Sequence, residues 1–482
     1  MIFATQPHPT LPILLDLTLV LELLAPVLDT NVGIMREIIK GTYRISCGGV
    51  TMKNISRWTG KGGSYRNVQR LFSASLDWLA LNLLLFELCY LSKPDAESAE
   101  RYMLAFDEVV EGKAGKQTHG INWFYSSIVG KVIRAVSYHV VSIVDTQKEE
   151  SFVLNHWQTV KEAQEKPKQK RVKTNRKQKK KRKKAQALCT DQPKRKAGRP
   201  KGSKNKQNVK ETGLLYQSFE FLLGKVMPLL CVILPNLKYV LADGAYGNKT
   251  CCLIVREFGL ELISKLNRNT GLYFPHEHKG LRKQGRPRKY GKKVDYQNMD
   301  KKYLVKTVTD GDLLTAYYQI SGLWTKKMPC LINVVIIVKT DLNTKKSGRV
   351  VLFSTDLKLS AEKIVRFYGL RFQIEFNFRD AKQYFGLADF KNTKPIQVNN
   401  AVGFAFFMDN VSLVLIEMAK ERWGEQEISI QDLKAWFRAE YYIQNILNTL
   451  KIPQNGILNQ SEFQDILKIG AVNRQKSDKQ AA

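Results

Sequence analysis

The sequence is short of negative charge. Its 482 residues contain 44 Asp and Glu against 77 Lys and Arg, so the formal net charge is +33. A compact chain with this excess repels itself unless a polyanion neutralises it, which makes nucleic acid the first partner to consider and an anionic membrane surface its rival. Recognisable RNA-binding modules, such as RNP strings, are missing as well, which argues against an RNA-binding protein.

Long uninterrupted apolar runs and paired cysteines are also missing. The one membrane candidate, residues 11–28, is interrupted by Asp16 and Glu22 and has no basic leader, so we interpret it as a core helix and expect no membrane association. The seven cysteines are odd in number and form no Cys-x-x-Cys, which favours free thiols in a reducing compartment. The short His276-Glu277-His278 has no further ligands at metal spacing and is interpreted as a polar loop rather than a zinc site.

Hydrophobic periodicity changes along the chain. Residues 11 to about 95 have Leu-rich helical spacing. The following part alternates short β-branched runs with helical patterns, and strands followed by helices predict an α/β core. The predicted strands of this part cover residues 102–110, 132–144 and 239–242, and the predicted helices cover residues 214–234 and 248–258. Strand patterns return between about 268 and 357, and a long helix is predicted at 360–385.

Residues 51–58 and 64–72 flank a glycine-containing turn and could form a helix-turn-helix. The second helix would present Arg66, Gln69 and Arg70, residue types that suit base edges and phosphates. Many small helical domains share this spacing, so a DNA-reading role and a plain scaffold both remain open.

One segment of the predicted core is extremely basic. Residues 161–210 contain 22 Lys or Arg and 3 acids, a net of +19 within the +33 of the chain. Such a segment cannot pack without a partner, so we expect a disordered arm that binds DNA through its charge. Two Gly-Arg-Pro cores, at Arg199 and Arg286, resemble AT-hooks, which insert arginine into the minor groove. Short basic turns produce such cores by chance, and generic phosphate contact is favoured.

The most specific pattern lies in the predicted helix 360–385. At about 100° per residue, Tyr368, Arg371, Glu375 and Lys382 fall within roughly 60° of arc. One helical face then brackets a carboxylate with cations, as a site that holds a metal beside a phosphate requires. An ordinary ion pair between Arg371 and Glu375, four positions apart, is the competing interpretation.

The unbroken Tyr-x2-Arg-x3-Glu-x6-Lys of these residues resembles the signature of the DDE transposases of bacterial insertion sequences, in the insertion-sequence-four-like family. In that family the glutamate is the third metal ligand and the other three side chains contact DNA phosphates. Asp243-Gly244-Ala245-Tyr246-Gly247 resembles the second-aspartate motif, and Leu104-Ala105-Phe106-Asp107-Glu108, followed by Gly115 to Gly120, resembles the first. The resemblance covers about residues 50–385.

The resemblance implies a catalytic, metal-binding triad of Asp107, Asp243 and Glu375. Carboxylates suit two Mg²⁺ ions, with Mn²⁺ as a substitute, and ions about 4 Å apart can activate an attacking hydroxyl and stabilise the leaving oxygen. Glu108 and Glu111 compete for the first position, although strand alternation lets only one of Asp107 and Glu108 reach a shared metal. For Asp243 the alternative is a turn-forming aspartate before glycine.

The predicted fold class is therefore α/β, with an RNase H-like catalytic core, a β-rich insertion and helical regions at both ends. The predicted domains are a helical region at 1–95 that is a candidate for DNA binding, the catalytic core at 96–267 and 358–390, the disordered basic insert at 161–210, the β-rich insertion at 268–357, and a helical region with a frayed tail at 391–482. In relatives the β-rich insertion helps to hold a flipped base, for which Trp324 is a candidate, although a packed tryptophan is favoured.

The resemblance implies a transposase that cuts transposon ends and joins them to target DNA, with terminal inverted repeats and target DNA as partners. It also implies a homodimer in the synaptic complex and a place at the nucleoid in a prokaryotic cytoplasm. Two alternatives stay open: a DNA-binding protein derived from a transposase that has lost activity, and an RNase H-like nuclease that cuts without strand transfer.

Overall fold

The computed structural model describes residues 12–28, 31–60, 62–91, 98–161, 213–277, 288–423 and 427–452, together with residues 466, 469 and 472. The predicted basic insert, apart from its first residue, and the two predicted minor-groove arginines, Arg199 and Arg286, lie outside the described residues.

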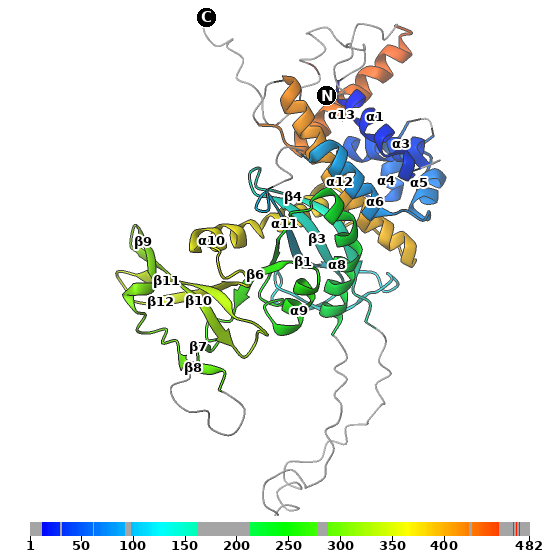
Figure 1. The fold of residues 1–482 in the computed structure, drawn as a ribbon. Helices are drawn as coiled ribbons and strands as arrows, with labels where there is room; N and C mark the ends of the chain where they lie inside the picture. The colour runs from blue at the N-terminus through cyan, green and yellow to red at the C-terminus, as the bar shows by residue number, and fades with distance from the viewer. Residues whose placement is uncertain are drawn as a thin grey trace, which may run out of the picture. The chain divides into compact units, whose positions relative to one another are not determined.

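A single twelve-stranded mixed sheet runs through the described part of the chain, in the order β2-β3-β1-β5-β6-β12-β11-β10-β7-β8, with β4 paired to β3 and β9 to β10 (Figure 1). Its first six strands are β1 (Tyr102–Gly112), β2 (Asn122–Ser126), β3 (Lys131–Asp145), β4 (Glu150–Gln158), β5 (Tyr239–Ala242) and β6 (Glu261–Leu266). The other six are β7 (Leu272–Pro275), β8 (Tyr290–Lys293), β9 (Leu304–Asp310), β10 (Leu313–Thr325), β11 (Ile332–Asp341) and β12 (Ser347–Ser354).

The centre of the sheet is parallel. β1 pairs with β5, and β5 pairs with β6, in parallel register, whereas β1 pairs with β3 antiparallel. The first five residues of β1 and all four residues of β5 are buried, as expected where helices cover both faces of a parallel sheet. The α/β fold class predicted from alternating strand and helix patterns is thereby confirmed.

Helices cover both faces of this centre. They are α8 (Leu214–Ile233) and α9 (Lys249–Glu257) on one face, and α10 (Ala361–Leu370) and α11 (Gln373–Tyr384) on the other. Phe106 of β1 contacts Phe219 of α8, with ring centroids 4.6 Å apart. Tyr239 of β5 contacts Phe367 of α10 from the opposite face, at 5.8 Å. Since side chains alternate along a strand, odd-numbered residues of β1 and β5 face α10 and α11.

The predicted helix 360–385 is wrong as one continuous helix. The structure ends α10 at Leu370 and begins α11 at Gln373. Between them the backbone N–H groups of Arg371, Phe372, Ile374 and Glu375 bond to carbonyls three residues back instead of four. A turn with these bonds has fewer residues than a turn of α-helix. The angular positions calculated at about 100° per residue therefore do not hold across residues 371–375.

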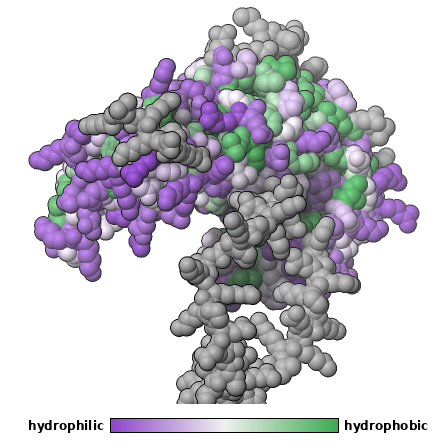
Figure 2. Space-filling model, turned by 60° about the horizontal axis from the view of Figure 1, so that its bottom comes forward, coloured by the Kyte–Doolittle hydropathy of each residue, from purple (hydrophilic) through white to green (hydrophobic). Residues whose placement is uncertain are grey.

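The predicted β-rich insertion continues the core sheet, because β12 pairs antiparallel with β6 from Val351↔Leu266 to Ser354↔Ile263. β11 and β10 then extend the sheet outward. Figure 2 shows mainly hydrophilic side chains over this part of the surface. The boundaries of the insertion as a domain stay a prediction.

The helices at the two ends of the described chain pack on each other (Figure 1). Those before the sheet are α1 (Pro12–Leu23), α2 (Ala25–Leu28), α3 (Val32–Arg44), α4 (Met52–Trp58), α5 (Tyr65–Phe72), α6 (Trp78–Leu85) and the π-helix η2 (Phe86–Tyr90). Those after it are α12 (Pro395–Trp423) and α13 (Ile430–Thr449). Buried hydrogen bonds join them, such as Trp78 Nε1 to Asn400 Oδ1 at 2.9 Å.

Two helices, Leu214–Ile233 and Pro395–Glu421, are long and apolar enough to cross a membrane by length and composition alone. The most apolar stretch of Pro395–Glu421 is 83% buried inside the protein, and that of Leu214–Ile233 is 39% buried, where α8 packs on β3 and β4.

Gly41 offers a test of how closely α3 and α4 approach. A Cβ at Gly41 would lie 3.0 Å from the Ile55 carbonyl oxygen and 2.8 Å from the Thr59 methyl group, whereas one at Gly33, on the same helix, meets nothing within 4 Å. We expect Gly41→Ala to lower the free energy of unfolding by about 1–3 kcal/mol through overpacking. Gly33→Ala should leave it unchanged or raise it by up to about 1 kcal/mol. Urea unfolding of both variants checks this, and equal effects would contradict the packing argument.

Candidate active site

Asp107 lies on β1, and Asp243 directly follows β5, the parallel strand that pairs with β1. The last paired residues of β1 and β5 are Phe106 and Ala242. Asp107 directly follows Phe106, and Asp243 directly follows Ala242. Neighbouring strands are about 4.8 Å apart. Both aspartates follow buried residues and are themselves partly exposed, on the face that α11 covers. The register of two strands therefore places two carboxylates together from positions 136 residues apart.

The turn after β5 fixes Asp243. Its carbonyl oxygen accepts hydrogen bonds from the Tyr246 N–H and from Ser264 Oγ of β6, both at 2.9 Å. Gly247 lies so close to β6 that a Cβ there would be 2.6 Å from the Lys265 carbonyl oxygen, which explains the glycine. Asn248 then caps α9. The local turn interpretation of Asp243 is thus realised in its backbone, and its carboxyl is close enough to Asp107 to interact with it electrostatically.

Glu375 lies in the first turn of α11, and Arg371 connects it to the strands. Arg371 Nη2 donates to Glu375 Oε1 at 2.8 Å, and Nη1 donates to Asp107 Oδ2 at 2.6 Å. The competing ion pair between Arg371 and Glu375 therefore exists, but the same guanidinium also neutralises the first aspartate. Arg371 Nε is buried and has no hydrogen-bond partner among the described residues.

Burial and like charge act on Asp107. Burial raises the pKa of its carboxyl, Arg371 and the Glu108 N–H oppose this rise, and Asp243 and Glu375 add to it, so that the pKa lies at about 6. Burial also raises the pKa of Tyr368, whose hydroxyl is close enough to interact with Arg371, Asp243 and Asp107. Tyr368, Arg371 and the three acids therefore share one electrostatic environment.

Strand alternation separates the acids of β1. Glu108 points away from α11 and accepts a hydrogen bond from Ser137 Oγ on β3. Glu111, on the same face as Asp107, pairs with Lys382 of α11, Nζ to Oε2 at 3.0 Å. Lys382 is thus brought to the same helix–strand interface as Arg371, about three turns along α11, and its charge is engaged with Glu111.

Lys113 and the pair of His139 and Tyr246 were missed by the sequence reasoning. Lys113 Nζ donates to the carbonyl oxygens of Ala388 at 2.8 Å and of Leu387 and Phe390 at 3.3–3.4 Å, and so ties the chain after α11 to the end of β1. Tyr246 is buried and its hydroxyl lies 3.0 Å from His139 Nδ1, behind the aspartates. Lone side chains at unremarkable spacing carry no sequence signal for such contacts.

Asp107 interacts electrostatically with Asp243 and Glu375, and carboxylate oxygens are the ligands that a hard divalent ion prefers. In this conformation Arg371 supplies the neighbouring positive charge, and within the described ranges no three His, Cys, Asp or Glu side chains are close enough to hold a metal ion. Asp107, Asp243 and Glu375 are the candidates to hold such an ion. His276 and Glu277 form no metal group with other described residues, and His278 is outside them.

The predicted helix-turn-helix segments are helices α4 and α5. Thr51 and Ser64 cap their N-termini by accepting hydrogen bonds from the N–H groups of Asn54 and Asn67. Val68, Leu71 and Phe72 turn inward, whereas Arg66, Gln69 and Arg70 of α5 are exposed. Arg66 and Arg70 make no ion pair with any residue that the structure describes, so they are available to an anionic partner.

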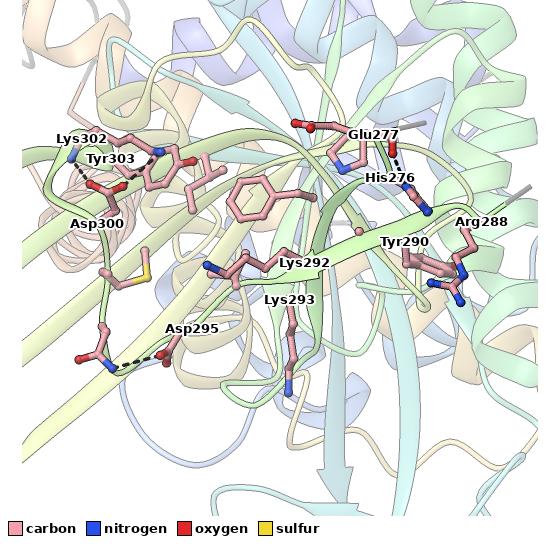
Figure 3. Close-up of a pocket in the computed structure, with 17 residues that line it drawn as sticks. His276, Glu277, Arg288, Tyr290, Lys292, Lys293, Asp295, Asp300, Lys302 and Tyr303 are labelled. Carbon is pink, nitrogen blue, oxygen red and sulfur yellow. Dashed lines mark hydrogen bonds and ion pairs between the residues drawn. The ribbon is translucent and has the colours of Figure 1, made fainter. Parts of the chain in front are cut away.

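Trp324 is half-buried on β10, and Lys289 Nζ lies 3.4 Å from the centre of its ring. Near it a cavity of about 980 Å³ opens between β7, β8 and the segment before β9 (Figure 3). Its charged lining is mixed, with Asp300 paired to Lys302 and Asp295 bonded to Asn298. None of the three acids lines it, so this cavity is not the candidate active site.

Two family models match parts of the chain. A family model described as "DDE superfamily endonuclease" matches residues 45–317, more than half of the chain, and includes Asp107 and Asp243. A second, described as "Archaeal putative transposase ISC1217", matches residues 325–417, which include Glu375. Comparison with curated proteins finds no match. The chain therefore belongs to the DDE superfamily of endonucleases and is a transposase.

Proposed function

We propose that Asp107, Asp243 and Glu375 form the metal-dependent catalytic site, and that the enzyme cleaves DNA at transposon ends and transfers the freed ends into target DNA. The observation that carries the proposal is the junction of the two parallel strands with α11. There, Asp107 and Glu375 share the guanidinium of Arg371, and Asp243 directly follows the strand that pairs with the strand of Asp107. Two Mg²⁺ ions, with Mn²⁺ as a substitute, are the proposed cofactors.

The residues divide the work as follows. The three carboxylates would hold the cations, which would polarise the phosphodiester and lower the pKa of the attacking hydroxyl. Arg371, which pairs with Asp107 and Glu375 in this structure, is proposed to bind a DNA phosphate, for which its fork geometry is suited. Tyr368 lies beside Arg371 and is proposed to contact the same strand. Lys382 requires release from Glu111 before it can do so.

Arg66 and Arg70 of α5 are proposed to recognise the terminal inverted repeats, and the basic segment with Arg199 and Arg286 to bind DNA through charge. The insertion-sequence-four-like subgroup is proposed from the signature of Tyr368, Arg371, Glu375 and Lys382. A homodimer that brings two ends together, in a prokaryotic cytoplasm at the nucleoid, completes the proposal.

The triad is tested with purified protein, Mg²⁺ or Mn²⁺, and a duplex that carries the ends of its element. We expect wild-type protein to nick at the 3′ ends and to join them to a supplied plasmid. Asp107→Asn, Asp243→Asn and Glu375→Gln should each lower cleavage on the order of a hundredfold or more, because each removes a metal ligand. The matched control is Glu108→Gln, next to Asp107 but on the opposite face of β1, which should retain activity.

Three outcomes separate the alternatives. Cleavage without joining indicates a nuclease that lacks strand transfer. Binding without cleavage, with either metal, indicates an inactive DNA-binding relative. Full activity of Asp243→Asn would refute the assignment of the triad.

The helix-turn-helix is tested by binding to the same ends. The Arg66→Ala/Arg70→Ala double variant should bind at least about tenfold more weakly and prefer its ends less over unrelated DNA. Its log affinity should also depend less steeply on log salt concentration, by up to about two slope units. Lys420→Ala on α12 removes one positive charge elsewhere and serves as control. If both variants bind as the wild type does, α5 is scaffold.

The raised pKa of Asp107 predicts that the free energy of unfolding depends on pH in protein kept free of metal by a chelator. Its folded-state pKa of about 6 lies above the model-peptide value of about 3.9, so the folded protein binds this proton more tightly. This contribution to the free energy of unfolding is present below pH 4 and is lost as pH rises through 6. Urea unfolding between pH 4 and 7 should show a loss in the wild type that is about 1–3 kcal/mol larger than in Asp107→Asn. Parallel pH curves would contradict the raised pKa.

A further inference from the structure

Two cysteine thiols from distant parts of the chain lie in contact outside the acidic site. Cys252 is buried on α9, and Cys330 is half-buried in the connection between β10 and β11. Their sulfur atoms are 3.7 Å apart, although 78 positions separate them in the sequence. A disulfide needs about 2.05 Å, so the sulfurs have to approach by roughly 1.7 Å, within reach of side-chain rotation and a small shift of the connection.

The surroundings make the two thiols unequal. A hydrogen bond from the Cys252 thiol and the nearby Arg256 guanidinium, one turn further along α9, lower the pKa of Cys330 to about 7, against burial and Glu261, which raise it. The same contact with Cys330, together with burial, raises the pKa of Cys252. A thiolate is the reactive form of cysteine, so the lowered pKa favours Cys330 as the nucleophile and Cys252 as the resolving thiol.

We propose that Cys252 and Cys330 form a redox-active dithiol that a peroxide converts into an intramolecular disulfide. The Cys330 thiolate attacks one peroxide oxygen, the O–O bond breaks, and the departing hydroxide takes a proton to become water, which leaves a sulfenic acid on Cys330. Cys252 Sγ then attacks that sulfur, the S–S bond forms, and the hydroxyl leaves as water with the proton of Cys252. Two thiols lose two electrons, and one peroxide is reduced to two waters.

The disulfide would join α9 to the connection between β10 and β11. α9 begins directly after the turn that carries Asp243, whereas Cys330 lies between two strands of the predicted β-rich insertion. Reversible disulfides of this kind occur in reducing compartments as redox sensors. An external dithiol would restore both thiols by exchange.

Cys251 provides the matched control. It is the next residue of α9 and is also buried, but its sulfur lies 3.6 Å from Asn248 Nδ2, and burial raises the pKa of its thiol to about 12. Cys47 and Cys231 are exposed free thiols.

The test oxidises the full-length protein with stoichiometric hydrogen peroxide, blocks remaining thiols and analyses unreduced tryptic peptides by mass spectrometry. Trypsin leaves Cys251 and Cys252 together on residues 250–256 and Cys330 on residues 328–339. The variants Cys251→Ser, Cys252→Ser and Cys330→Ser therefore assign the bond. We expect the cross-linked pair in wild type and Cys251→Ser, its loss in the other two variants, and its disappearance after treatment with dithiothreitol.

A second measurement follows the intermediate with dimedone, which traps sulfenic acids. Cys252→Ser should accumulate dimedone on Cys330, because the resolving thiol is gone, and Cys330→Ser should show none on Cys252. A bond between Cys251 and Cys252, cross-links only between exposed cysteines of different chains, or Cys330 that stays reduced in wild type while other thiols oxidise would each overturn the proposal.

Discussion

The contact on which the candidate site depends is the double ion pair of Arg371. Its guanidinium lies between Asp107 of the first strand and Glu375 of α11, and it fastens that helix to the sheet. Without a cation here, the negative charges of Asp107, Asp243 and Glu375 would repel one another in a partly buried space, at an electrostatic cost. Two further contacts hold this region to β1. Lys382 of α11 pairs with Glu111, and Lys113 donates hydrogen bonds to carbonyl oxygens of the segment after α11. One strand face therefore positions the helix, its glutamate and the segment that follows.

Much of the fold could be predicted because its signals are local. The β-branched runs of β1, β3 and β5, the helices α4, α5 and α9, and the turn after Asp243 all lie where periodicity, caps and glycines indicated. The order of the three acids along the chain, and their likeness to a family pattern, pointed to the superfamily that the comparisons then identified. Their roles as ligands stay a prediction.

What could not be predicted depends on contacts between distant residues. The helix through Arg371 appeared continuous, because no Pro interrupts it, and tertiary contacts break it instead: α10 packs on β5, β6 and β10–β12, and α11 on β1, β3 and β4. The pairing of Arg371 with Asp107 spans 264 positions, and that of Lys382 with Glu111 joins two residues assigned to separate motifs. Charge types alone do not say which of several acids an arginine or lysine meets.

The order in which the chain supplies these parts has a consequence for its synthesis. β1 and β5 leave the ribosome first, whereas Arg371, Glu375 and the helix that holds them follow only after the whole β-rich block has been made. Until then the two aspartates lie at the edge of a sheet that lacks its covering helix and its third acid. If the three act together, as proposed, a prematurely terminated chain can expose two carboxylates but cannot cut DNA. A shortened copy of the gene would then yield a protein that keeps the N-terminal helices α4 and α5 but lacks a complete catalytic centre.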